Sequence, residues 1–389
     1  MHLAFSPQAG DAVSYLEMGQ DCASDLAKCW NVLRPMGASL FYSLPYRLGL
    51  PPTSIIILNW LLLAGSVGLM FWTTRRLDPG GRWSQRLRLA AIVAVHLAFL
   101  WATSWNSLSD LPAGIFALAG VQLMLLAKGI DRWWLYLAIG LSLGAAVSLR
   151  AFYLYPAVAT IFALVLGSVR QPRRLLRRCA ALVLLVPLAI QYGETYRRSQ
   201  MIGFIHPPLE DLARRIHFRS TLAGYDTGFG GAIRRDGKKC FQDSHNFKDA
   251  VDKRDASALA CILERRHEFY FGTYTLGGAV YLAKAAERHE STALLIMNTL
   301  VFMGALVRLA FRRRRSHSLV VGLFMLMLYA QASVIVPESR FLCVVFVWMW
   351  SDILCATIAT SSCWLVRHPG HWRLRRRDRF DRSSQLHAA

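Results

Sequence analysis

Charged side chains stand at the ends of several long apolar runs, where a membrane protein seldom places them without a purpose. Asp110 precedes the run that begins at Leu111, Arg150 separates two apolar runs, and Glu338 and Arg340 follow Pro337. An arginine can bind a phosphate through two parallel hydrogen bonds, and a carboxylate can act as a general base or hold a divalent cation. These residue types therefore suit transfer of a group from a phosphate-linked donor. An ion pair between helices, or a side chain reaching the membrane surface, would explain any one of them singly.

A second set of candidate residues lies in the first 52 residues, ahead of the first long apolar run. Asp11 follows Gly10 at a candidate helix start, where its carboxylate could accept hydrogen bonds from the first N–H groups. Tyr15 comes four residues later and shares a helix face with Asp11. Arg34 precedes Pro35. We hypothesise that this segment lies outside the membrane and that Asp11 is the catalytic carboxylate.

The composition indicates an all-α polytopic membrane protein. Hydrophobic residues make up 54% of the 389 residues, and 12 residues are tryptophan. Each apolar run is close to the length of about 20 residues that crosses a bilayer core, which predicts about nine transmembrane helices. The runs cover residues 53–73, 89–106, 111–127, 133–148, 152–168, 179–193, 292–311, 319–337 and 341–365.

Most of the net charge of +21 falls in alternate loops between these runs. Because cytoplasmic loops are enriched in Lys and Arg, we place these loops in the cytoplasm. Solvated charges at a membrane surface account for them, so we do not predict nucleic-acid binding. The basic loops cover residues 75–88, 128–132, 170–178, 308–315 and 367–382.

This sidedness divides the chain into five parts. We expect an external first loop with amphipathic helices, the first part of a transmembrane bundle, an external lid or small domain, the second part of the bundle, and a basic cytoplasmic tail. Their boundaries are 1–52, 53–193, 194–291, 292–366 and 367–389. An external N-terminus with no signal peptide also leads us to expect that a preceding span is missing.

The cysteines fit the same sidedness. Four of them would be external, where disulfides can form, and pairs 22–29 and 240–261 are the simplest of three connectivities. The other four lie in or near the runs and are interpreted as small apolar fillers. These are Cys179, Cys343, Cys355 and Cys363.

Short motifs resemble those of the GT-C class of membrane glycosyltransferases, which includes protein O-mannosyltransferases and lipid A aminoarabinose transferases. Asp11-Ala12-Val13-Ser14-Tyr15-Leu16 is similar to the Asp-x-x-x-Tyr-Leu pattern of the first external loop in that class. Further matches, in the same order, are Arg34-Pro35-Met36-Gly37, Ser109-Asp110-Leu111, the Gly-rich run that ends at Arg150, and Arg340-Phe341-Leu342. The resemblance spans about 340 residues.

The resemblance implies an enzyme that transfers a sugar, with inversion, from a polyprenyl-phosphate-linked donor to a glycan, lipid or protein acceptor on the outer face. It implies Asp11 as the base, Asp110 as a second catalytic residue, and Tyr15, Arg34, Arg150, Glu338 and Arg340 as substrate-binding residues. It places the protein in a bacterial inner membrane. A divalent metal ion is left open as a cofactor, and no metal ligand is assigned, because Ala12 stands where a second acidic residue is often found.

Two other functions remain open. The chain could be a transporter or flippase of lipid-linked glycans, although no inverted repeat supports this. It could also be an inactive, truncated relative that serves as a subunit. Asp352 falls inside the last apolar run, and we interpret it as a polar contact within the bundle. Five histidines between residues 206 and 289 lack metal-site spacing.

Overall fold

The computed structural model describes a helical protein. Every regular element in the described part of the chain is a helix. The described residues are 11–30, 35–79, 81–104, 110–127, 130–199, 261, 264, 267, 292–311, 315–334 and 342–367. The predicted lid or domain at 194–291 and the tail at 367–389 lie almost wholly outside these residues.

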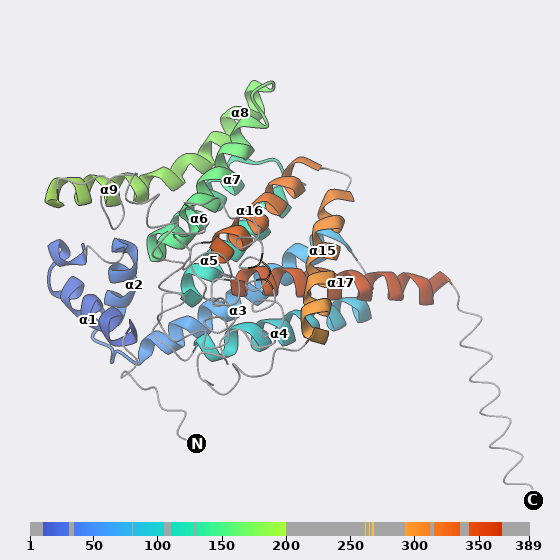
Figure 1. The fold of residues 1–389 in the computed structure, drawn as a ribbon, viewed down its shortest axis with the longest axis horizontal. Coiled ribbons are helices and arrows are strands. Elements are labelled where there is room, and N and C mark those ends of the chain that lie inside the picture. The colour runs from blue at the N-terminus through green and yellow to red at the C-terminus, as the bar shows by residue number, and fades with distance from the viewer. Residues whose placement is uncertain are drawn as a thin grey trace, which may run out of the picture.

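The N-terminal residues form a small helical unit of their own. It consists of α1 (Asp11–Ser24), the 3-10 helix η1 (Leu26–Cys29) and α2 (Met36–Arg47). A disulfide joins Cys22 to Cys29, as in the simplest of the three connectivities, and Arg47 donates a hydrogen bond to the Cys22 carbonyl oxygen at 2.9 Å. Tyr15 and Tyr42 are in the core of this unit, which lies at the edge of the main bundle (Figure 1). The unit is therefore closed by a covalent link as well as by packing.

The main bundle uses helices from both halves of the chain (Figure 1). Its helices are connected by the 3-10 helices η2 (Ala151–Tyr153) and η3 (Ala180–Leu184). The first half supplies α3 (Ser54–Leu77), α4 (Arg82–Ser104), α5 (Asp110–Ala127), α6 (Trp133–Leu149), α7 (Leu154–Leu166), α8 (Pro172–Cys179) and α9 (Leu185–Ser199). The second half supplies α15 (Thr292–Phe311), α16 (Arg315–Val334) and α17 (Cys343–Arg367).

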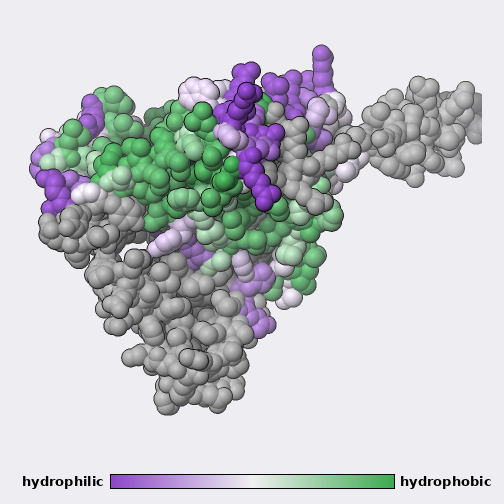
Figure 2. All heavy atoms as spheres, turned by 90° about the horizontal axis from the view of Figure 1, so that it is seen from above, coloured by the Kyte–Doolittle hydropathy of each residue, from purple (hydrophilic) through white to green (hydrophobic). Residues whose placement is uncertain are grey.

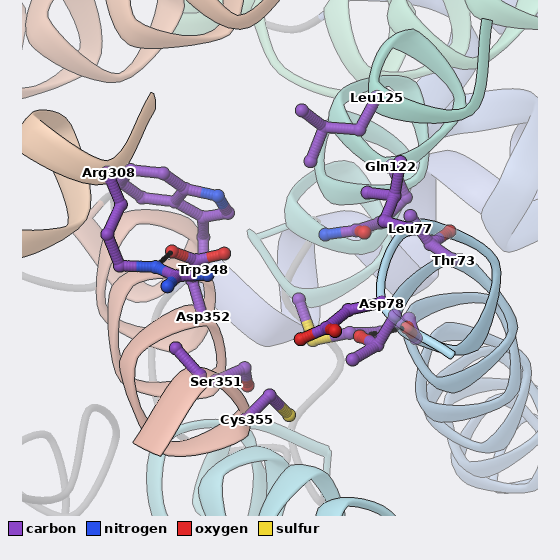
Figure 3. Close-up of a pocket in the computed structure, with 13 residues that line it drawn as sticks. Thr73, Leu77, Asp78, Gln122, Leu125, Arg308, Trp348, Ser351, Asp352 and Cys355 are labelled. Atoms are coloured by element: carbon purple, nitrogen blue, oxygen red, sulfur yellow. Dashed lines mark hydrogen bonds and ion pairs between the residues drawn. The ribbon is translucent and has the colours of Figure 1, made fainter. Parts of the chain in front are cut away.

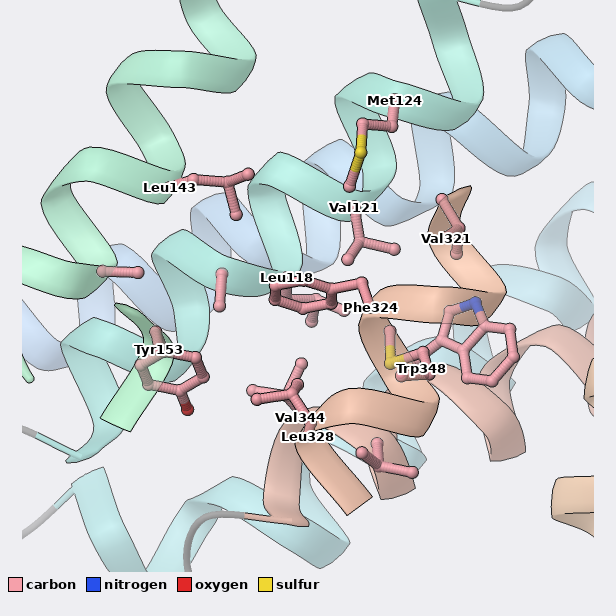
Figure 4. Packing of buried hydrophobic residues seen from close by; sticks show 14 of the residues in the cluster. Leu118, Val121, Met124, Leu143, Tyr153, Val321, Phe324, Leu328, Val344 and Trp348 are labelled. Carbon is pink, nitrogen blue, oxygen red and sulfur yellow. The ribbon is translucent and has the colours of Figure 1, made fainter. Parts of the chain in front are cut away.

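Helix α5 is the centre of the bundle. It packs against α3, α4, α6, α16 and α17, and nearly all of its side chains are buried. Leu118 and Val121 of α5 lie beside Phe324 of α16 in the core (Figure 4). Gly120 allows the close approach of α6, because a Cβ at that position would lie 2.7 Å from Leu143 Cδ2. An apolar helix without a polar face is the expected occupant of such a position.

The outer helices expose apolar side chains instead of polar ones. Ile57 and Leu61 of α3 and Leu300 of α15 are each more than 60% exposed. Figure 2 shows a broad band of hydrophobic side chains across the described surface, with hydrophilic side chains at its margins. A water-soluble protein rarely exposes so much contiguous apolar surface, and a lipid bilayer would cover it. The arrangement is compatible with a multi-pass membrane protein.

The predicted count of nine spans is not supported. Four described helices are long and apolar enough to cross a membrane, judged by length and composition alone: α3, α5, α15 and the Cys343–Ser361 part of α17. Shorter apolar helices cover Trp133–Leu149, Ala151–Leu166 and His317–Gln331. At 1.5 Å per residue, the 13 residues of α7 span only about 20 Å, less than the bilayer core of about 30 Å.

A largely buried acidic side chain of α17 is paired inside the bundle. Asp352 pairs with Arg308 at 2.9 Å, which confirms the predicted polar contact within the bundle. Cys179, Cys343 and Cys355 take part in no disulfide, whereas Cys261 is disulfide-bonded. Cys240, which was predicted to pair with Cys261, and the side chain of Cys363 lie outside the described part of the chain.

Candidate functional site

A buried ion pair joins the start of α5 to the end of α6. Asp110 is the first residue of α5, and Arg150 follows the last residue of α6 in an extended conformation. The Nε atom of Arg150 lies 2.9 Å from Oδ1 of Asp110, and the two side chains are 14% and 4% exposed. A charge pair so far from water requires close geometry to be tolerated. The pair therefore fixes the orientation of the Arg150 guanidinium group.

Tyr15 brings the N-terminal unit to this pair. The Arg150 Nη1 atom donates to the Tyr15 hydroxyl at 3.3 Å, across 135 residues of sequence. The Tyr15 ring lies 5.2 Å from the Tyr42 ring, with a tilt of 31°. Tyr15 and Tyr42 are both buried. Arg150 thus contacts Asp110 through Nε and Tyr15 through Nη1, and these contacts come from different helices.

The Tyr42 hydroxyl is a buried polar group whose oxygen has no hydrogen-bond partner among the described residues. Burial raises the pKa of Tyr42 well above its ordinary value, and the nearby Tyr15 and Asp110 raise it further, whereas Arg150 lowers it. Tyr42 is therefore a neutral hydroxyl that can donate a hydrogen bond. A buried donor without a partner normally costs about 1–3 kcal/mol, which makes it a candidate ligand contact.

Two further contacts hold the N-terminal unit against the bundle. A Cβ at Gly37 would lie 2.5 Å from Ser148 Cβ, so the backbone of α2 at Gly37 lies directly against Ser148 near the end of α6. The Met36 amide donates to Oε1 of the buried Gln191 in α9 at 2.7 Å. Because Ser148 is two residues before Arg150, the approach at Gly37 also positions the ion pair.

Only some of the predicted site residues can be compared with one another. The structure places Asp110, Arg150 and Tyr15 in contact, although they are far apart in sequence. Asp11 is the first residue of α1, one turn before Tyr15, and the side chain of Asp11 is outside the described part of the structure. Arg34, Glu338 and Arg340 lie outside the described residues. Their predicted roles remain predictions.

Tyr42 and Tyr153 were missed by sequence reasoning. A Cβ on Gly114 of α5 would lie 3.5 Å from the Tyr153 hydroxyl oxygen. Tyr153 therefore packs against α5 one helical turn after Asp110. The sequence feature that could have indicated Tyr42 is its spacing of four residues from Ala38, because both side chains are buried on one face of α2. That spacing predicts burial but does not indicate which residue Tyr42 meets.

Comparison with known proteins identifies no relative. No family model, no curated protein and no solved structure matches this chain. In the described part of the chain, no group of three or more His, Cys, Asp or Glu side chains lies together in a way that could hold a metal ion. The fold and site therefore describe a helical protein with membrane-type helices and a buried Asp–Arg–Tyr cluster.

Proposed function

We propose that the protein is an integral-membrane glycosyltransferase that uses a polyprenyl-phosphate-linked sugar as donor and acts on the outer, periplasmic face of a bacterial inner membrane. The observation that carries the proposal is the buried Arg150, held by Asp110 and capped by Tyr15. A guanidinium oriented in this way suits the phosphate of a lipid-linked donor, which lies at the depth where membrane helices end.

Each residue has a distinct role in the proposed reaction. The acceptor hydroxyl attacks the anomeric carbon, the bond from that carbon to the phosphate oxygen breaks, and polyprenyl phosphate leaves with the electron pair. Asp11 takes the proton of the acceptor hydroxyl as general base. Arg150 stabilises the charge that grows on the leaving phosphate, and Asp110 positions Arg150 through the ion pair.

The location of the cluster is consistent with an outer-face site. The N-terminal unit carries the Cys22–Cys29 disulfide, and disulfides persist in oxidising compartments. Arg75 and Arg76 end α3 at the other end from the N-terminal unit, and α8 is rich in arginine. By the positive-inside rule these basic segments face the cytoplasm. The two signals are independent and agree on the sidedness of the site.

The test is sugar transfer by purified protein reconstituted into vesicles with polyprenyl-phosphate mannose, glucose or aminoarabinose and a mixed acceptor pool. Release of polyprenyl phosphate would be measured for wild type, for Asp11→Asn and for Glu17→Gln, a matched carboxylate on the exposed face of α1. We expect Asp11→Asn to lower transfer at least 100-fold, and Glu17→Gln to retain it. Both variants should unfold at the wild-type temperature.

Three results would contradict parts of this proposal. Full turnover by Asp11→Asn would remove Asp11 as the base but leave the transferase function. Movement of the labelled lipid across the vesicle membrane without release of polyprenyl phosphate would favour a transporter or flippase instead. Absence of transfer with every donor, in a protein that co-purifies with an active transferase, would favour the inactive-subunit alternative.

A further inference from the structure

A polar hollow lies inside the bundle at the end opposite the Asp110–Arg150 pair. It is formed where α3, α5, α15 and α17 meet (Figure 3). Its cavity volume is ≈ 40 Å³. Gln122 lines it from α5, 12 residues after Asp110. At 1.5 Å per residue this is about 18 Å along the helix, so the hollow is separate from the candidate transferase site.

Two buried donors at the hollow have no partner among the described residues. The indole Nε1–H of Trp348 and the hydroxyl of Ser351 both belong to α17, both residues are 1% exposed, and both line the hollow. Figure 3 shows Trp348 and Asp352 on one side, facing Gln122 and Asp78 on the other. A structure seldom leaves two such donors unsatisfied in one place unless a bound group or water completes them.

The charges at the hollow cancel. Asp352 pairs with Arg308 at 2.9 Å, and Asp78 pairs with Arg88 at 3.5 Å. Two carboxylates and two guanidinium groups leave no net charge to attract a free anion or a free metal cation. The lining instead offers unsatisfied donors next to carboxylate and amide oxygens, which accept hydrogen bonds. A hydroxyl group, which both donates and accepts, complements such a lining.

The volume of the hollow further limits which group can bind in it. A cavity needs about 10–15 Å³ for each water, so the hollow of ≈ 40 Å³ has room for about three non-hydrogen atoms and admits one end of a glycerol unit, with the rest at its mouth. Arg308 and Asp78 are partly exposed, with side chains 37% and 52% exposed, and so mark the way in. We propose that the hollow binds glycerol hydroxyls, either as free glycerol or as the glycerol headgroup of a phospholipid from the leaflet next to the basic loops. With the headgroup, the phosphate stays outside the hollow, at its mouth.

The test uses full-length protein and lipids with the same acyl chains. Binding of phosphatidylglycerol, phosphatidylethanolamine and phosphatidylcholine would be compared by native mass spectrometry, and free glycerol by the thermal shift of the detergent-solubilised protein. Ser351→Ala and Trp348→Phe each remove one unpartnered donor; Ser351→Ala changes the shape little, whereas Trp348→Phe also removes buried ring volume. Trp350→Phe, on the same helix as Trp348, is the matched control, because the Trp350 Nε1–H already donates to Oδ1 of Asn298 in α15 at 3.0 Å.

We expect phosphatidylglycerol to bind at least tenfold more tightly than the other two lipids. Ser351→Ala and Trp348→Phe should each weaken that binding about three- to tenfold, as loss of one hydrogen bond does, while Trp350→Phe leaves it unchanged. A glycerol-dependent thermal shift lost in the same two variants, without lipid preference, would assign the guest as free glycerol. Equal binding of all three lipids with no variant-sensitive glycerol shift would overturn the proposal and leave the hollow to water.

Discussion

Arg150 and Asp110 meet at the same end of the bundle although they terminate different helices. Arg150 follows the C-terminus of α6 and Asp110 opens α5, and their charged groups lie 2.9 Å apart. Antiparallel packing of α5 and α6 brings these ends together, so the pair depends on the register of the two helices. A change at either residue tests both the packing and the proposed site.

Asp110→Asn should lower the free energy of unfolding by about 3 kcal/mol, because it leaves the buried Arg150 charge without compensation. Arg150→Leu should cost a similar amount, and the double variant should cost less than the sum of the two. Chemical denaturation in detergent would measure this cycle. Arg174→Gln is the control, since its pair with Asp131 spans 3.8 Å with Arg174 55% exposed, and should cost less than about 1 kcal/mol. Strict additivity of the first two changes would contradict the coupling.

Tyr42→Phe should leave the ligand-free protein as stable as wild type or more stable by about 1 kcal/mol, since it removes a hydroxyl oxygen without a described partner. Tyr15→Phe should instead destabilise by about 1 kcal/mol, because it removes the acceptor of the Arg150 hydrogen bond. Thermal unfolding of the two variants side by side makes the comparison. A larger loss for Tyr42→Phe than for Tyr15→Phe would mean that the Tyr42 hydroxyl is satisfied.

The stability of the protein should fall as pH rises above about 10. The raised pKa of Tyr42 keeps its proton on in the folded state while the unfolded chain loses it, so high pH favours unfolding. The contribution is fully present below pH 10 and disappears as pH rises, at up to about 1.4 kcal/mol per pH unit. Tyr42→Phe should show a shallower decline in a pH series of unfolding midpoints. An unchanged slope would show that Tyr42 does not titrate differently in the folded state.

Gly37→Ala should destabilise the protein by about 1–3 kcal/mol, because the added methyl group would press into Ser148. The effect should reach the ion pair two residues further on and lower any transferase activity. Gly68→Ala is the control, since nothing lies within 4 Å of a Cβ there and the change favours the helix. Equal effects of the two substitutions on the melting temperature would argue against the close contact.

Thr53→Cys and Gln171→Cys should be labelled from opposite sides of the membrane. Thr53 is exposed just before α3, next to the N-terminal unit, and Gln171 is exposed just before the basic helix α8. In a Cys179→Ser background, an impermeant maleimide should label Thr53→Cys in intact cells and Gln171→Cys only after lysis. The reverse pattern would place the disulfide unit in the cytoplasm and end the proposed sidedness.

The helical class follows from the sequence because each long apolar run can satisfy its backbone groups only as a helix in an apolar environment. The predicted runs at 111–127 and 292–311 agree closely with α5 and α15. Hydropathy marks an apolar run but does not fix where the helix within it begins and ends. The count of nine was not supported because several runs form helices shorter than a bilayer core requires, such as the 13-residue α7.

The candidate site was partly accessible to sequence reasoning. Asp110 and Arg150 stand out because a charge interrupts an apolar pattern. Tyr42 and Trp348 do not, because an aromatic residue in an apolar segment has the pattern of an ordinary core residue. Whether the polar atom of such a residue has a partner depends on neighbours distant in sequence, which the pattern does not reveal.

The central position of α5 also constrains how the protein is made. Its neighbours α16 and α17 are synthesised about 200 residues after it, yet Phe324 and Trp348 share its core cluster. During translation α5 must therefore wait with one side uncovered by its own chain, and in a membrane that side would be covered by lipid or by an insertion factor. Assembly can be completed only after the last helix has left the ribosome, so a chain cut short before α17 would leave α5 open and be a substrate for membrane proteases.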